Sequence, residues 1–264
     1  MDFERARIED VETRVKSAVE RAKEKQEELN AVVSFVDVDS QLTDLANKDP
    51  HAPLYGMPIV LKDNVNMKGV RTTASSRILD NYIPVYDAHI SEKLKEAGAI
   101  VIAKSSMDEL GMGGTNKNAY TGKVNNPWDT MRISGGSSGG SAVLVASGVV
   151  PFAIGTDTGD SVRKPAAYNG IIGMKPTYGR ISRYGVIPYA SSLDHVGYFT
   201  TAIEDAAVAL EVLAGRDDRD MTSSYEPVPN YASDINSDIK GKKIAILDNV
   251  QEAITNAEIK ENFD

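Results

Sequence analysis

Residues 135–185 read GGSSGGSAVLVASGVVPFAIGTDTGDSVRKPAAYNGIIGMKPTYGRISRYG, and the rest of the chain is organised around this stretch. It combines glycines, paired serines and basic residues at a density that no other part of the sequence reaches. The glycine-serine run leads directly into SAVLVAS, which predicts a helix over Ser141–Ser147. The glycines would pack at its N-terminus, where free backbone N–H groups bind an anion or oxyanion. We expect a serine nucleophile and its proton-relay partner here, completed by Lys62 far upstream.

Other interpretations of GGSSGGS are possible. A P-loop is excluded because the lysine that must follow its last glycine is missing, and the spacing is not that of a GxGxxG dinucleotide loop. A flexible linker is the plain alternative. Gly135, Ser137 and Gly139 also match GxSxG, the nucleophile elbow of the α/β-hydrolases, for which His195 is the only histidine downstream. That elbow must follow a buried strand, whereas the preceding residues, NNPWDTMRIS, resemble a loop.

Composition limits the classes of function. The net charge of -9 and the pI near 5.0 argue against a broad basic face that would bind DNA or RNA. The absence of cysteine excludes disulfides and thiolate metal sites. The charged N-terminus lacks the apolar core of a signal peptide, and no apolar run reaches the length of a membrane span. We expect a cytoplasmic protein without a DNA or membrane partner.

Helical and strand patterns alternate along the chain, which indicates an α/β fold. An amphipathic helix is expected within residues 1–30, from Ile8 to Leu29. Thr201 and Glu204 predict a capping box that opens a helix closed by Gly215. Further helices are expected over Gln41–Lys48, Asp87–Ala97, Ser141–Ser147 and Ala202–Ala214. Strands are expected over Ala31–Val36, Ile59–Leu61, Ala99–Ala103, Val149–Ile154 and Lys243–Leu247, although Pro151 argues against a central position for the fourth.

Lys62 lies at the end of a predicted strand, in the motif GMPIVLKDN. A lysine in this position is more often a solvated residue at the rim of a sheet. If its amine is drawn into the interior instead, desolvation lowers its pKa and lets it act as a base. The motif alone leaves both interpretations open and favours the solvated one.

A serine nucleophile without an available histidine needs another base, and a neutral lysine is the known substitute. Lys62 in KDN, Ser137 in GGSSGGS and Ser161 in TGDSVRKPA, with Asp157 before it, together resemble the signature of the amidase-signature family. The run GMKPTYGRISRYGVIPYASSLDHVG is similar in particular to the glutamine-cleaving subunits of tRNA-dependent amidotransferases. The resemblance extends from about Val32 to Ala214. It implies a mixed β-sheet covered by helices on both faces, as one domain over residues 1–264 whose C-terminal part is absent.

The resemblance also implies a role for each motif residue. Ser161 would be the acyl-ester nucleophile, Ser137 its proton relay and Lys62 the base. Lys62 should then be buried without a carboxylate partner, so that it is neutral during the attack. The oxyanion would be met by the backbone N–H groups of Thr158, Gly159, Asp160 and Ser161.

Glutamine is the implied substrate, and amidotransferase B and C subunits are the implied partners. tRNA would be reached only through the B subunit, which would also use ATP and Mg. This chain would hold no cofactor and no metal. A stand-alone amidase acting on another carboxamide and a catalytically inactive scaffold that binds the partner subunits remain as alternatives.

Asp160 departs from the family pattern, because most members have glycine at this position. A carboxylate about 5 Å from an oxyanion costs roughly 3 kcal/mol at an effective dielectric of ~20. That cost is similar to the roughly 2.7 to 4 kcal/mol that one oxyanion donor supplies. We expect Arg163 and Lys164 to pair with Asp160 and to turn its charge outward.

Overall fold

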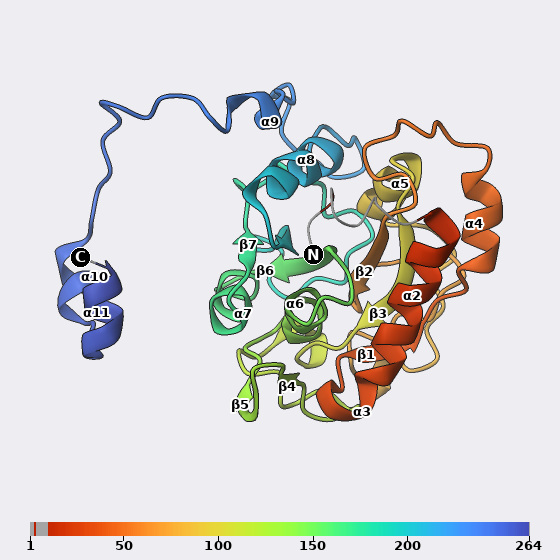
Figure 1. Ribbon diagram of the computed structural model, residues 1–264, viewed down its shortest axis with the longest axis horizontal. Helices are drawn as coiled ribbons and strands as arrows, with labels where there is room; N and C mark the ends of the chain where they lie inside the picture. The colour runs from red at the N-terminus through yellow and green to blue at the C-terminus, as the bar shows by residue number, and fades with distance from the viewer. Residues whose placement is uncertain (1–2, 4–9, 264) are drawn as a thin grey trace. The chain divides into compact units, whose positions relative to one another are not determined.

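A six-stranded mixed sheet with the order β1-β3-β2-β6-β8-β7 forms the centre of the chain (Figure 1). In this computed structural model the described residues are 3 and 10–263. The strands of the sheet are β1 (Val32–Phe35), β2 (Pro58–Lys62), β3 (Ile100–Ser105), β6 (Phe152–Asp157), β7 (Ile172–Met174) and β8 (His195–Thr200). A separate two-stranded hairpin is formed by β4 (Asn125–Asn126) and β5 (Asp129–Ile133).

The three central strands of the sheet are parallel. β2 pairs with β3 on one side and with β6 on the other, while β1, β8 and β7 are antiparallel to their neighbours. The carboxyl ends of β2, β3 and β6 therefore meet at one edge of the sheet, which is where open α/β sheets place their ligand sites. Lys62, Ser105 and Asp157 are the last residues of these strands.

Helices cover both faces of the sheet. The helices are α2 (Val11–Glu24), α3 (Gln26–Leu29), α4 (Asp39–Leu45), α5 (His89–Glu96), α6 (Gly139–Ala146), α7 (Arg163–Asn169), α8 (Ile203–Leu213), α9 (Tyr231–Asp234), α10 (Asp248–Glu252) and α11 (Ala257–Phe263). α2 and α6 pack on one face, where they share a core with Val60, Ile102 and Phe199. The predicted α/β class, with a mixed sheet covered on both faces, is confirmed.

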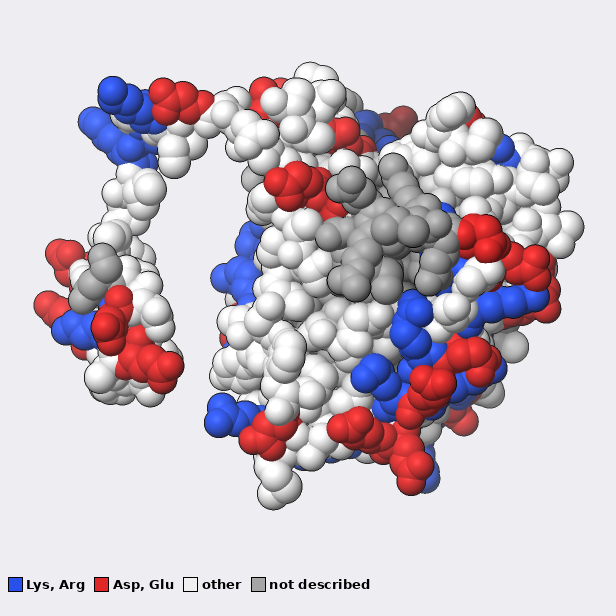
Figure 2. Space-filling view, in the orientation of Figure 1, with Lys and Arg blue, Asp and Glu red and all other residues white. Residues whose placement is uncertain are grey.

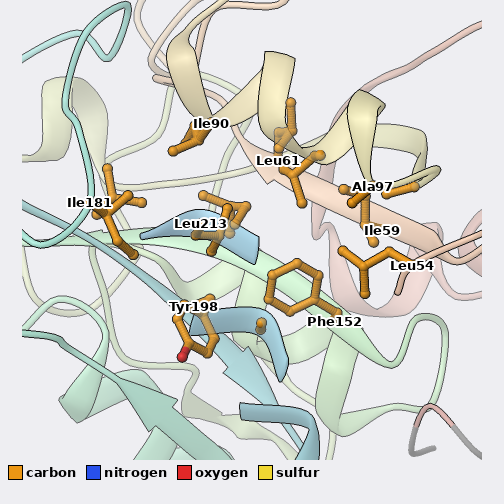
Figure 3. Close-up of a cluster of buried hydrophobic side chains, with 14 of the residues drawn as sticks. Leu54, Ile59, Leu61, Ile90, Ala97, Phe152, Ile181, Tyr198 and Leu213 are labelled. Carbon is orange, nitrogen blue, oxygen red and sulfur yellow. The ribbon is translucent and has the colours of Figure 1, made fainter. Parts of the chain in front are cut away.

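α5 and α8 pack on the opposite face of the sheet. Side chains of a strand alternate between faces, so Ile59 and Leu61 of β2 point into this second core, whereas Val60 and Lys62 point away from it. Figure 3 shows the cluster, in which Phe152 lies beside Tyr198. The buried hydroxyl of Tyr198 donates a 2.6 Å hydrogen bond to the carbonyl of Ala206, so this polar group is satisfied inside the core.

Most elements expected from sequence are present, with small shifts at their ends. Pro151 immediately precedes β6, so it removes no ladder donor and does not prevent a central position. The predicted capping box is wrong, because α8 begins one residue later and has Ala202 as its N-cap. Ile8, the first residue of the expected N-terminal helix, lies outside the described residues.

The chain forms two units, Met1–Ala232 and Ser233–Asp264. The second unit contains α10 and α11. The strand predicted over residues 243–247 does not form there, and Ile244 and Leu247 are exposed. β propensity alone is insufficient, since a strand needs a neighbour to take its backbone hydrogen bonds. Among the described residues, no helix combines the length and the apolar character needed to cross a membrane.

Figure 2 shows acidic and basic side chains mixed over α2 rather than a continuous basic area on that part of the face. Lys16 is paired with Glu12 and Lys23 with Glu20, so neighbouring charges cancel. This pattern agrees with the acidic net charge and offers no phosphate-binding surface on α2.

Candidate active site

Lys62 is completely buried at the end of β2, on the face of the sheet that α6 covers. Its amine lies 2.8 Å from the hydroxyls of Ser137, Ser138 and Thr156, and 3.4 Å from the carbonyl of Thr156. No carboxylate lies in hydrogen-bond contact with it in the described part of the chain. The interpretation of Lys62 as a solvated rim residue is therefore wrong.

Burial lowers the pKa of Lys62 from its ordinary value to about 7. The carboxylates of Asp108, Asp157 and Asp194 oppose this shift, because negative charge favours the protonated amine. Desolvation is the larger of the two effects. A substantial fraction of the amine is therefore neutral near pH 7, as a general base requires.

The glycine-serine run is a buried and hydrogen-bonded turn rather than a linker. The Gly136–Ser137 peptide bond is cis. A Cβ at Gly136 would meet the carboxylate of Asp108 at 2.0 Å, and one at Gly140 would meet the carbonyl of Ser106 at 2.5 Å. Only glycine allows this approach of backbone to neighbouring groups.

Asp108 holds this turn in place. Its N–H donates to the carbonyl of Ser137 at 3.1 Å. Its carboxylate accepts hydrogen bonds from the N–H groups of Thr115 and Asn116, and the amide oxygen of Asn116 accepts the N–H of Gly139 at 2.9 Å. The predicted relay serine is thus fixed by contacts from a loop that follows β3.

Ser138 and Thr156 also hold the amine of Lys62, and sequence reasoning gave neither a role. The hydroxyl of Ser138 donates to the carbonyl of Thr156 at 3.1 Å, so toward Lys62 it acts as an acceptor. The hydroxyl of Thr156 accepts from the amide of Asn64 at 3.2 Å. The only signal for Thr156 was its place near the end of β6, beside the end of β2.

Ser161 lies in the turn after β6 and is nearly buried. Its carbonyl accepts the N–H of Ser138 at 3.2 Å, which places its backbone against the serine pair. In the described residues no hydrogen bond joins its hydroxyl to that of Ser137. The structure therefore places Ser137 in direct contact with Lys62 and Ser161 in the adjoining turn, and the role of each remains a prediction.

The predicted oxyanion donors are free. Within the described chain, the backbone N–H groups of Thr158, Gly159, Asp160 and Ser161 have no acceptor. Successive backbone N–H groups without an acceptor are the groups with which turns bind anions. This turn has the backbone chemistry to stabilise an oxyanion.

Asp157 anchors the end of the same turn. Its carboxylate is buried and accepts the N–H groups of Val162 and Arg163, and it pairs with the guanidinium of Arg163 at 2.9 Å. Contact with this guanidinium and with the two N–H groups lowers the pKa of Asp157 despite the opposing effect of burial. The expected pairing of Arg163 with Asp160 is therefore wrong, because the more deeply buried Asp157 takes the guanidinium.

Within the described chain, the ion-pair partner of Asp160 is Lys164. The two side chains form a 2.6 Å ion pair, and the carboxylate is 44% exposed. The other half of the expected compensation is thus confirmed: the charge is paired and faces solvent. A screened, half-exposed carboxylate has a weaker effect on the turn than a buried one.

Replacing Lys164 by alanine is expected to slow acylation of Ser161 by about two- to fivefold, in line with the worth of an exposed ion pair. Without its ion-pair partner, the negative charge of Asp160 would destabilise the negative charge of the oxyanion. The rate of reaction with a fluorophosphonate probe measures the effect, and Lys164→Ala in an Asp160→Gly background serves as the control, with no further loss expected. An increase of several orders of magnitude in Asp160→Gly alone would show that Lys164 does not compensate.

A pocket of about 330 Å³ opens beside Ser137. Its wall includes Ser137, Thr156, Thr158 and Asp194. The hydrolase interpretation with His195 as the base is wrong, because Ser137 contacts Lys62, while Nδ1 of His195 donates to the carbonyl of Leu193 at 2.7 Å. Two charged residues of the pocket wall, Arg183 and Asp220, form an ion pair with each other.

The sequence of the chain is similar to those of known proteins. A family model described as Amidase matches residues 13–264. The A subunit of glutamyl-tRNA(Gln) amidotransferase from Sulfurihydrogenibium sp. is 43% identical over 256 residues, which cover 94% of this chain and 52% of the relative. Its counterpart from Geobacillus kaustophilus is 48% identical over 244 residues, covering 91% of this chain and 48% of the relative.

Solved structures are also similar. The crystal structure of the A subunit of glutamyl-tRNA(Gln) amidotransferase from Thermotoga maritima superimposes with a TM-score of 0.78 at 39% identity, over 86% of this chain and 49% of that chain. A peptide amidase in complex with the inhibitor chymostatin gives a TM-score of 0.79 at 31% identity, over 86% of this chain and 50% of that chain. This chain spans about half the length of the curated relatives that it matches.

Proposed function

The chain belongs to the amidase family, and on that premise we propose that it is the glutamine-cleaving A subunit of a glutamyl-tRNA(Gln) amidotransferase. The observation that carries the proposal is the contact between the buried Lys62 and Ser137, beside the turn that holds Ser161. Curated relatives with this name, over nearly the whole chain, favour this branch of the family.

The reaction begins when Ser161 Oγ attacks the carboxamide carbon of glutamine. Its proton passes to Ser137 as the proton of Ser137 passes to Lys62 Nζ. In this proposal the oxyanion forms at the N–H groups of residues 158–161, which have no acceptor within the described chain. The carbon–nitrogen bond then breaks, and the leaving nitrogen takes the proton back through Ser137. Ammonia departs, and water hydrolyses the resulting acyl ester of Ser161 to glutamate.

The ammonia would be used by partner subunits. In this proposal a B subunit uses ATP and Mg to activate glutamate on tRNA, and a small C subunit joins the two larger ones. tRNA would contact the B subunit, in keeping with the acidic charge of this chain. The complex would act in the cytoplasm as a carbon–nitrogen ligase of translation, and this chain would contribute no cofactor or metal.

Release of ammonia from glutamine tests the proposal. We expect it to be enhanced when B and C subunits are added, and we expect these subunits to co-purify with the chain. Hydrolysis of other carboxamides without any bound partner would instead favour a stand-alone amidase, to which the likeness to the peptide amidase points. A folded chain whose Ser161 reacts with no acylating probe would favour an inactive scaffold.

The rate of Ser161 acylation is expected to rise with pH through about 7, because Lys62 must lose its proton and its pKa is lowered to about 7. If Lys62 were solvated, the rise in rate would instead be centred near pH 10.4. Measuring the probe reaction between pH 5.5 and 9 locates the midpoint. A flat profile would show that the titration of Lys62 does not limit the reaction.

A further inference from the structure

Asp194 is a buried carboxylate in the pocket wall, and the relay of Lys62, Ser137 and Ser161 gives it no role. The hydroxyl of Thr158 donates to its Oδ1 at 2.5 Å. The N–H of Tyr189 donates to Oδ2 at 2.9 Å, and that of Ala190 lies 3.0 and 3.1 Å from the two oxygens. One carboxylate thus joins two separate segments of the pocket wall.

The sheet explains why these segments meet. β6 and β8 are antiparallel, and Asp157 lies opposite His195 at the end of the ladder. The next residue after β6 is Thr158, and the residue before β8 is Asp194, so the two side chains leave the sheet side by side. Thr158 is also the first of the four residues whose N–H groups are free.

The turn over residues 158–161 is therefore held at both ends by carboxylates. Asp157 accepts the N–H groups of Val162 and Arg163, which follow the turn. Asp194 accepts the hydroxyl of Thr158, which begins it. A hydrogen bond from a hydroxyl to a carboxylate is short and about twice as strong as a neutral one. The free N–H groups lie between these two anchors.

We propose that Asp194 is a positioning residue that aligns the oxyanion turn with the substrate pocket through the hydroxyl of Thr158. This role rests on the proposed amide cleavage at Ser161. Stabilisation of an oxyanion depends on donors that are fixed before the reaction. Removing this anchor should therefore reduce the chemical step far more than it reduces binding.

Three variants test the proposal through reaction of the 264-residue chain with a fluorophosphonate probe. In Asp194→Asn the charge and one acceptor oxygen are lost, and the NH2 group would face either the hydroxyl of Thr158 or the N–H groups of Tyr189 and Ala190, so the charge-assisted bond from Thr158 is lost. We expect the maximal rate of acylation to fall about 100-fold, with less than a threefold change in the half-saturating probe concentration. Thr158→Val should lose a similar factor, and Thr158→Ser should stay within threefold of the unmodified chain.

The pH profile separates positioning from general damage to the fold. Asp194 is one of the carboxylates that raise the pKa of Lys62. Asp194→Asn should therefore move the rising limb of the profile to lower pH, whereas Thr158→Val should leave it in place. If the substitution merely loosened the fold and let water reach the amine of Lys62, the pKa of Lys62 would rise and the rising limb of the profile would move to higher pH. The double variant should be no slower than Asp194→Asn, because both changes break the same contact.

Three results would each overturn the proposal. They are a near-normal rate of acylation in Asp194→Asn, a shift of its rising limb to higher pH, and a double variant in which the two single losses of rate multiply. If thermal melting shows that Asp194→Asn is not folded, the proposal is tested by comparing the acylation rates of Thr158→Val and Thr158→Ser. Lys62→Met belongs in the same series. An inert unmodified chain, or equal rates with and without Lys62, would refute the amide-cleaving function itself rather than the role of Asp194.

Discussion

Replacing Lys62 by methionine is expected to slow acylation of Ser161 by roughly 10⁴-fold or more, similar to the loss of one member of a catalytic triad. Methionine fills a similar volume but cannot take a proton. Among the described residues Ser137 would then have no base in hydrogen-bond contact, since the other neighbours of the amine are hydroxyls and a carbonyl. The measurement is the rate of probe reaction per folded molecule.

Lys62→Arg provides a matched control for charge. The guanidinium stays protonated at all working pH values, so this variant should be as inactive as Lys62→Met although it keeps a cation at the site. Addition of a small amine, such as methylamine, is expected to restore part of the rate in Lys62→Met only. Activity of either variant within tenfold of the unmodified chain would refute the assignment of Lys62 as the base.

Lys104→Met is expected to reduce the free energy of unfolding by about 3–5 kcal/mol, the usual loss when one partner of a buried ion pair is removed. Lys104 is completely buried on β3, 3.5 Å from Asp63, and donates to the carbonyl of Val65 and the hydroxyl of Thr72. Without it the buried carboxylate of Asp63 has no ion-pair partner among the described residues. Urea denaturation followed by fluorescence measures the change.

Asp63→Asn in the Lys104→Met background should recover much of this stability, because the uncompensated charge is removed with it. Acylation per folded molecule should change only a few-fold in Lys104→Met, since Leu61 and Lys104 share a register position and Lys62 points to the other face. Equal stability of the single variant and the unmodified chain would show that the pair does not hold the loop after β2.

The two lysines show how far sequence reasoning reached. Lys62 is the last residue of β2 and Lys104 the second-last residue of β3, and burial lowers the pKa of both. The motif KDN and the separated serines identified Lys62, whereas nothing in AIVIAKSS distinguished Lys104 from a rim residue. The difference lies in the register of β2 and β3, which places one amine among hydroxyls and the other beside a carboxylate.

Other features of the site were not predicted for the same reason, since they depend on contacts between distant parts of the chain. Arg163 could pair with either Asp157 or Asp160 as far as the sequence shows. It pairs with Asp157, because this carboxylate is fully buried at the end of β6 whereas that of Asp160 is half-exposed. Thr156 and Asp194 reach the site because β6 lies between β2 and β8. Periodicity predicted the strands themselves but not their order, since strand order depends on contacts between residues far apart in the sequence. Residues 243–247 carried the strand pattern and found no neighbour.

The burial of Lys62 also makes folding a proton-releasing event in alkaline solution. An unfolded chain carries this amine protonated up to about pH 10.4, whereas the folded chain releases the proton near pH 7. Between these values the unfolded state binds more protons, so this lysine makes unfolding less favourable as the pH rises, by up to about 1.4 kcal/mol per pH unit. The heat of folding at pH 8–9 should accordingly depend on the ionisation enthalpy of the buffer that accepts this proton. The amine that is proposed to accept a proton from Ser137 during each turnover must first lose the proton that it carries in the unfolded chain.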